Sequence, residues 1–270
     1  MTIDDELGPI DYDETGSGPT ILFVPGSCST GAAWKAVIAR LANRFRTITT
    51  SLPGYGGTAE RRTGGDRSIS LVASAIEAVI RRAGEPVHLV GHSFGGEVGL
   101  VVALRGQALL ESLVILEAPA PEMLATFDKR GPYAEFRTMT SAYIADFHSG
   151  NAEAIAAVID FYGGVGTFAS WPPAIRAYAM ATTATNILDW DSAYTSHPSP
   201  AALAALDLPV RVAVGEHSHP AVIEVNALIA RAIPRASFET IAGADHFMIA
   251  THPDAVATLI VDHVAARHAG

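Results

Sequence analysis

Short apolar runs alternate with helix-like segments along most of this chain, and this alternation restricts the possible folds more than any other feature. Residues 21–24 form a continuous apolar run that ends at a Pro-Gly pair, as expected of a strand buried on both faces. Further strands are predicted at residues 47–50, 87–90, 112–116, 210–214 and 236–241, and helices at 69–83, 95–105 and 253–263. The pattern predicts an α/β fold with a mainly parallel central sheet and helices on both of its faces.

The chain before residue 21 offers little room for another long strand. Residues 10–12 are predicted to form a strand that pairs as a hairpin with residues 21–24.

Residues 119–206 interrupt the alternation. They contain no clear strand, are rich in alanine and hold 12 of the 20 aromatic residues of the chain. These rings either fill a small core of their own or line an apolar pocket. We therefore expect a core made of residues 1–118 and 207–270, with residues 119–206 inserted as a helical cap.

Composition excludes several classes of function. A net charge of −10 argues against a nucleic-acid partner, which requires a basic surface. The uncharged run at residues 161–175 is broken by glycine and proline, so no membrane span is expected. Cys28 is the single cysteine, which excludes an intrachain disulfide and suits the cytoplasm, as does an acidic N-terminal sequence unlike a secretory signal. No phosphate loop or dinucleotide motif is present, so no cofactor is expected.

The residues Gly91-His92-Ser93-Phe94-Gly95 lie between a predicted strand and a predicted helix. A serine in such a tight turn needs strained backbone angles, and the flanking glycines let strand and helix pass closely. The turn would lift the Ser93 hydroxyl above the carboxyl edge of the sheet, beside free N–H groups of the helix N-terminus. This context indicates a nucleophile. His92 is expected to point away from it, across the turn.

Here the chain resembles the α/β-hydrolase superfamily, and the likeness covers almost its whole length. The motifs that carry it are residues 23–26, 52–56, 91–95, the inserted cap and Gly243-Ala244-Asp245-His246-Phe247. The resemblance implies a base that follows the nucleophile and the last strand. It also implies an oxyanion hole made by the backbone N–H groups of Phe94 and Ser27, although Pro25 stands where relatives often carry histidine.

His246 is the predicted base, because a serine hydroxyl becomes a good nucleophile only when a nearby imidazole accepts its proton. Its position after the predicted strand 238–241 places it near Ser93 at the same sheet edge. His217 and His219 form a pair, but no third ligand follows at suitable spacing, and no metal site is expected.

The sequence offers more than one candidate for the acid of the triad. The family's usual pattern after the strand 210–214 reads Gly215-Glu216-His217-Ser218, with serine where aspartate is expected. Glu117 is preferred, because a carboxylate at the end of an apolar strand is costly to bury without a partner. Glu216 and a serine–histidine pair without any acid remain alternatives, while Asp245 is interpreted as structural.

The resulting hypothesis is a serine hydrolase that cleaves a small or medium ester, thioester or lactone with an apolar part. Ser93 forms the acyl-enzyme, His246 acts as the base and Glu117 orients His246. Two alternatives stay open. One is a different reaction on the same fold, such as carbon–carbon bond hydrolysis, a lyase reaction or cofactor-free peroxide chemistry. The other is a ligand-binding protein with a degraded triad. The aromatic surface of a cap could also form a homodimer.

Overall fold

The central sheet of the computed structural model has seven strands in the order β3-β5-β4-β6-β7-β8-β9. The structure describes residues 1–6, 8–41 and 44–268. The strands are β3 (Asp13–Thr15), β4 (Thr20–Val24), β5 (Arg46–Thr49), β6 (Val87–His92), β7 (Leu110–Leu116), β8 (Val210–Gly215) and β9 (Ala236–Ile241). β3 runs antiparallel to β5, and every other pair in this sheet is parallel.

The predicted hairpin between residues 10–12 and 21–24 is wrong. β2 (Gly8–Asp11) pairs instead with β1 (Thr2–Asp5) in a separate two-stranded sheet. β4 lies between β5 and β6, so neither of its edges is free for a hairpin partner. Gly16 has a φ of 81°, and a Cβ there would lie 2.3 Å from the carbonyl oxygen of Phe45. The chain thus crosses closely over the end of β5, and β3 joins the sheet at that outer edge.

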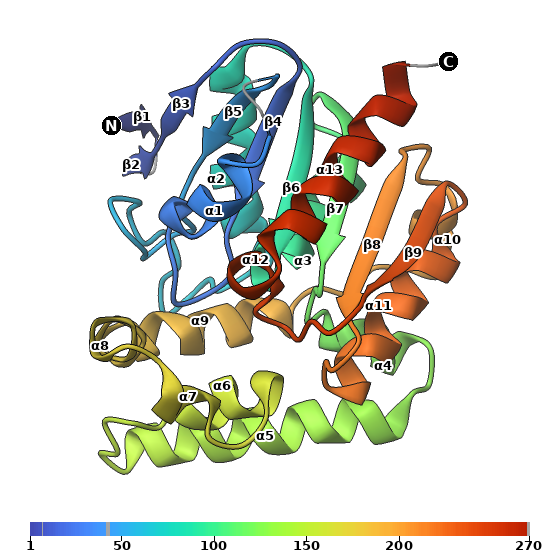
Figure 1. Ribbon diagram of the computed structural model, residues 1–270. Coiled ribbons are helices and arrows are strands. Elements are labelled where there is room, and N and C mark those ends of the chain that lie inside the picture. The colour runs from blue at the N-terminus through green and yellow to red at the C-terminus, as the bar shows by residue number, and fades with distance from the viewer. Residues whose placement is uncertain (7, 42–43, 269–270) are drawn as a thin grey trace.

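Helices cover both faces of the sheet, as predicted (Figure 1). They are η1 (Gly31–Trp34), α1 (Lys35–Ile38), α2 (Ile69–Ala83), α3 (Phe94–Arg105), α11 (Pro220–Ala232), α12 (Met248–Thr251) and α13 (Pro253–His268). Alternate residues of each strand face opposite sides, so Leu22 packs with one group of helices while Ile21 and Phe23 pack with the other. The first core contains side chains of α2, α3 and α11, and the second contains side chains of η1, α1, α12 and α13.

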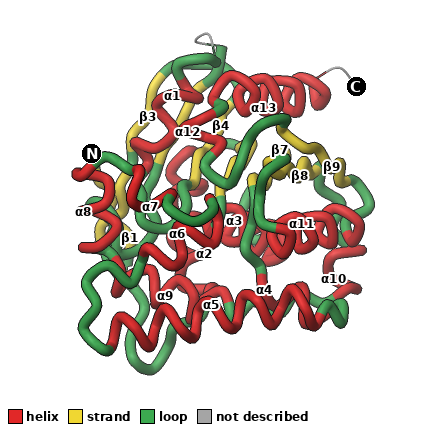
Figure 2. Tube along the Cα trace, turned by 60° about the horizontal axis from the view of Figure 1, so that its bottom comes forward, coloured by secondary structure: helices red, strands yellow, loops and turns green. Residues whose placement is uncertain are grey.

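The chain between β7 and β8 is helical. It forms α4 (Pro121–Thr126), α5 (Arg130–His148), α6 (Ala156–Gly163), α7 (Thr167–Ser170), α8 (Pro173–Ala181), α9 (Thr183–Ala193) and α10 (Pro200–Ala204). Helices α5 to α9 lie at the bottom of Figure 1, below the strands, and Figure 2 brings them forward. This arrangement leaves the loops that follow β4, β6 and β9 facing α6 and α9.

Candidate active site

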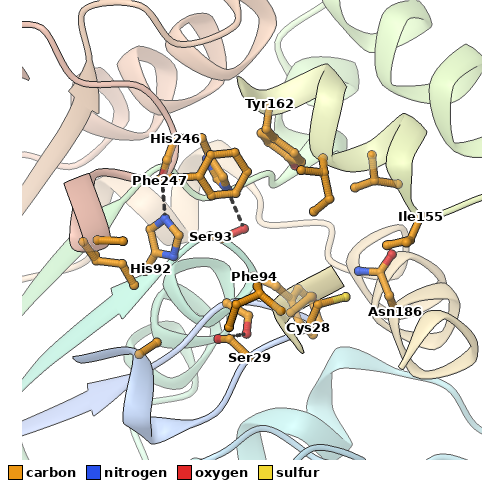
Figure 3. Close-up of a pocket in the computed structure, with 18 of the residues that line it drawn as sticks. Cys28, Ser29, His92, Ser93, Phe94, Ile155, Tyr162, Asn186, His246 and Phe247 are labelled. Carbon is orange, nitrogen blue, oxygen red and sulfur yellow. Dashed lines mark hydrogen bonds between the residues drawn. The ribbon is translucent and has the colours of Figure 1, made fainter. Parts of the chain in front are cut away.

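Ser93 occupies a strained turn between β6 and α3. Its φ of 53° and ψ of −129° lie outside the regions that residues with a side chain normally adopt. A Cβ at Gly91 would lie 2.4 Å from the carbonyl oxygen of Gly95, and one at Gly95 would lie 2.3 Å from that of Pro25. Glycine is therefore required at both positions, for the close approach that the sequence pattern indicated. Figure 3 shows the Ser93 hydroxyl pointing into a pocket.

His246 lies on the loop after β9 and reaches back to Ser93. Its Nε2 atom is 3.1 Å from the Ser93 hydroxyl oxygen, and its ring is almost completely buried. The loop therefore brings together two residues that lie 153 positions apart in the chain.

Glu117 follows β7 and contacts the other ring nitrogen of His246. Its Oε2 atom is 2.7 Å from His246 Nδ1. The second oxygen, Oε1, accepts hydrogen bonds from the Gly215 N–H, at 2.6 Å, and from the Ser218 hydroxyl. Burial alone would raise the pKa of Glu117, but these donors together with the nearby His246 lower it below the usual glutamate value. The site thus holds a buried carboxylate in its ionised form.

The other candidate carboxylates lie elsewhere. Glu216 Oε2 accepts a hydrogen bond from the Gly243 N–H at 2.8 Å, on the exposed side of the loop. Asp245 Oδ1 accepts one from the Phe247 N–H at 2.9 Å. Ser218, which stands at the family's usual acid position, donates to Glu117 instead. Of the carboxylates considered from the sequence, the structure brings Glu117 to His246.

The predicted oxyanion residues lie beside the nucleophile. Ser27 and Phe94 both line the pocket. The loop that carries Ser27 passes so close to Ser93 that a Cβ at Gly26 would lie 2.8 Å from the Ser93 Cβ. Phe94 is the first residue of α3, where backbone N–H groups have no partner within the helix.

A buried ionic network connects this loop to α9. Asp189 accepts hydrogen bonds from the hydroxyls of Ser27 at 2.5 Å and Tyr55 at 2.6 Å. It also forms a 2.6 Å ion pair with Arg62, whose side chain is fully buried. Because a buried charge without a partner is costly, these contacts hold α9 against the Ser27 loop.

His92 was missed by the sequence reasoning, which expected it to point away. It lines the pocket, and its ring lies 4.8 Å from that of His246. His92 Nε2 is 2.8 Å from the backbone carbonyl of His246. Because a carbonyl only accepts, Nε2 carries the proton. Burial, with His246 beside it, lowers the pKa of His92 to about 3, so His92 is neutral and supports the His246 loop. The one sequence feature that could have indicated this role is that His92 directly precedes the nucleophile Ser93.

Tyr162 of α6 is the aromatic residue that the sequence could not single out. Its ring stacks on the imidazole of His246 with centroids 4.0 Å apart and an interplanar angle of 23°. Phe247 contacts the same imidazole edge-on at 5.4 Å. The imidazole is thus enclosed by rings from the inserted helices and from its own loop (Figure 3).

The pocket has a volume of about 770 Å³, within the range of small-molecule sites. Its apolar wall comes largely from the inserted helices and includes Ile155, Val158, Ile159, Trp171, Ile175 and Trp190. Among residues 1–6, 8–41 and 44–268, no three His, Cys, Asp or Glu side chains are grouped as a metal site. None of the helices described is both long and apolar enough to cross a membrane.

Comparison with known proteins places this arrangement in a family. Residues 21–259 match the alpha/beta hydrolase family. The chain belongs to that family. Among solved structures, this hydrolase-family chain is similar to an alpha/beta hydrolase from Sphaerobacter thermophilus (22% identity, 98% of this chain and 100% of that one, TM-score 0.73). It is also similar to a thermophilic esterase from Thermogutta terrifontis (20% identity, 99% of each chain, TM-score 0.77). At these identities the likeness establishes the fold alone.

Among curated proteins, the hydrolase-family chain is 31% identical over 116 residues to the pimeloyl-(acyl-carrier protein) methyl ester esterase of Aeromonas salmonicida, covering 43% of this chain and 44% of that protein. Among the curated relatives, the segment that matches this chain spans about a third to a half of each relative's length.

Proposed function

We propose that this protein is a serine hydrolase that cleaves ester-like bonds, with Ser93 as nucleophile, His246 as general base and Glu117 as the acid of the triad. One observation carries the proposal: the continuous chain of contacts from Ser93 Oγ to His246 Nε2 and from His246 Nδ1 to Glu117 Oε2, opening into an apolar pocket. The ester, thioester or lactone cleaved has an apolar part, because the pocket wall is mainly apolar.

The proposed reaction follows from that chain. The ionised Glu117 accepts a hydrogen bond from the N–H at His246 Nδ1. Because the proton of the neutral ring is then on Nδ1, Nε2 is free to act as a base. As the Ser93 oxygen bonds to the substrate carbonyl carbon, its proton moves to His246 Nε2. His246 then returns the proton to the leaving alkoxide or thiolate as the carbonyl–leaving group bond breaks. A water oxygen then bonds to the acyl carbon while its proton moves to His246 Nε2. His246 returns that proton to the Ser93 oxygen as the bond between Ser93 and the acyl group breaks, and the acid is released.

The backbone N–H groups of Ser27 and Phe94 are proposed to stabilise the negative oxygen of the tetrahedral intermediate. Ser27 is suited to this task because Asp189 holds its side chain, so the loop needs no rearrangement during the reaction. Residues 119–206 are proposed to act as the cap that encloses the substrate. The names of the esterase relatives agree with ester hydrolysis.

Labelling with a fluorophosphonate probe, followed by intact-mass analysis and peptide mapping, tests the proposal. We expect one adduct per chain, on Ser93. Ser93→Ala should abolish labelling and lower the turnover of p-nitrophenyl esters at least about 10³-fold, since the nucleophile itself is removed. Ser74→Ala, which removes a serine hydroxyl from α2 that does not line the pocket, is the matched control.

Three outcomes would overturn the proposal. A folded wild-type protein that binds esters without labelling or turnover would favour the ligand-binding alternative. Ester turnover that survives Ser93→Ala would place the chemistry elsewhere. Turnover of dienoic ketones in preference to esters would favour carbon–carbon bond hydrolysis by the same residues.

A further inference from the structure

Two residues that line the pocket carry a buried side-chain polar atom without a hydrogen-bond partner among the residues described. They are Asn186, through its carbonyl oxygen Oδ1, and Trp190, through its indole nitrogen Nε1. Both belong to α9 and lie four positions apart, so they are neighbours on one side of that helix. One supplies an acceptor and the other a donor.

Two neighbouring polar side chains of the wall, Asp189 and Tyr178, already have partners within the protein. Asp189 accepts from Ser27, Tyr55 and Arg62. The Tyr178 hydroxyl accepts from the Gly56 N–H at 3.4 Å. Asn186 and Trp190 therefore differ from these neighbours in having hydrogen-bonding capacity left for a ligand.

The carboxamide of Asn186 faces the pocket. In Figure 3 it lies on the opposite side of the pocket from His246, near Ile155. The group that it binds thus belongs to a part of the ligand removed from the reacting carbonyl. The terminal torsion of asparagine is soft, so a rotation of the carboxamide presents either its N–H or its oxygen to that ligand.

We propose that Asn186 and Trp190 form a polar subsite that selects ester substrates whose acyl chain carries a secondary amide. This inference rests on the proposed function and specifies its substrate class. The amide N–H donates to Asn186, and the amide carbonyl accepts from the Trp190 N–H. A secondary amide offers these two functions on separate atoms, which matches two side chains one helical turn apart.

An apolar pocket makes this selection strong. A hydrocarbon chain leaves both polar atoms unpaired, whereas an amide chain pairs them and has its own polar atoms paired in return. The apolar side chains of the same wall, such as Ile155 and Ile159, cannot supply the missing hydrogen bonds.

The test compares two p-nitrophenyl esters with acyl chains of the same length, N-acetyl-β-alanyl and hexanoyl. For each protein, kcat/KM of the amide ester is divided by kcat/KM of the hexanoyl ester. Dividing the value of a variant by that of wild type then cancels the different intrinsic reactivities of the two esters. We expect Asn186→Leu to lower the preference for the amide ester at least about tenfold. Trp190→Phe, which keeps a ring but removes the N–H, should lower it in the same direction.

Thr185→Ala is the matched control, since it removes a hydroxyl from α9 that does not line the pocket, and the ratio should stay within about twofold of wild type. The rate of fluorophosphonate labelling at Ser93 verifies that each variant is folded. If Asn186→Leu slows both esters equally or leaves their ratio unchanged, the subsite is refuted.

The methyl esters of N-acetyl-β-alanine and hexanoic acid can also be compared for binding to Ser93→Ala by calorimetry. This measurement separates the inference from the proposed function because it requires no hydrolysis. Tighter binding of the amide ester, lost in Ser93→Ala/Asn186→Leu, supports the subsite even if wild type hydrolyses neither ester. Equal binding of the two esters overturns the subsite and leaves the proposed function untouched.

Discussion

Ser93 and Glu117 share an unusual backbone conformation at the ends of neighbouring strands. Their φ angles are 53° and 54°, although neither is glycine. Such a conformation costs on the order of 1–3 kcal/mol and persists only where the surrounding structure enforces it. At Glu117 the enforcing contacts include a hydrogen bond from its own N–H to the Ala213 carbonyl. Both side chains contact His246, so at these two positions the strained backbone belongs to the site; Cys28, Ala120 and Asp128 also have a positive φ.

Glu117→Gln should lower kcat about 10²- to 10⁴-fold with little change in KM, because an amide no longer stabilises the protonated imidazole. Steady-state kinetics with a p-nitrophenyl ester measure the effect. Glu216→Gln is the matched control and should retain activity within about twofold. A strong loss in Glu216→Gln with an active Glu117→Gln would reverse the assignment.

Glu97 of α3 is a buried carboxyl group outside the proposed reaction. Burial first, and then the neighbouring Glu122, raises the pKa of Glu97 to about 8, and its Oε2 accepts a hydrogen bond from the Ala120 N–H. In the unfolded chain the group titrates near 4.5. Between these two values the folded protein binds one more proton than the unfolded one, so this group's contribution to stability falls as the pH rises.

Glu97→Gln should therefore change how stability depends on pH. Relative to wild type, the variant gains stability steadily from pH 5 to pH 8, by a few kcal/mol at the upper end, since each pKa unit corresponds to about 1.4 kcal/mol. Thermal unfolding of both proteins at several pH values measures the difference. A difference in Tm that is constant across this range would contradict the assignment.

At the scale of elements, the inserted helices contribute directly to the site. Helix α9 supplies Asp189, whose buried ion pair with Arg62 connects it to the loop before α2. Helix α6 supplies Tyr162, which stacks on His246. The position of these helices is thus coupled to the geometry of the base.

Tyr162→Leu should lower kcat about tenfold, because the ring face no longer packs on the imidazole and no longer stabilises its positive charge during the reaction. Tyr162→Phe keeps the ring and should recover most of the activity. Phe161→Leu is the control on the same helix, since Phe161 stacks on His219 instead. Steady-state kinetics and thermal unfolding separate a loss of positioning from a loss of fold. Equal losses in the Phe and Leu variants would assign the effect to the hydroxyl group.

At the scale of the whole molecule, the pocket exists only because two parts of the chain meet. Ser93 and His246 come from the loops of the central sheet, and the apolar wall comes largely from the helices between β7 and β8. The loops of the central sheet therefore supply the reacting groups, and the helices between β7 and β8 set most of the preference for a substrate. Substitutions in α8 or α9 are expected to change KM for a given ester more than they change labelling of Ser93.

Lengthening the acyl chain should raise kcat/KM while the pocket still has space. From p-nitrophenyl butanoate to the hexanoate we expect roughly a tenfold increase, since each buried methylene contributes about 0.8 kcal/mol. Kinetics across a series from butanoate to dodecanoate would also reveal the length at which the pocket is full. A decrease from butanoate onwards would mean that the apolar wall binds the leaving group instead.

Sequence alone predicts the alternation of strands and helices, the turn around Ser93 and the choice of His246 as the base to test. These features depend on local properties: runs of apolar side chains, and glycines where the chain must turn or pass closely. The order of nucleophile and base along the chain can also be read directly.

The tertiary structure decided what depends on contacts between distant residues. Whether Glu117 or Glu216 reaches His246 is set by how the ends of β7, β8 and β9 align, because a shift of one residue turns a side chain to the other face. The pairing of β3 with β5, the stacking of Tyr162 and the unpaired polar atoms of α9 arise in the same way. Periodicity shows that a residue is buried, but only packing determines which residue it meets.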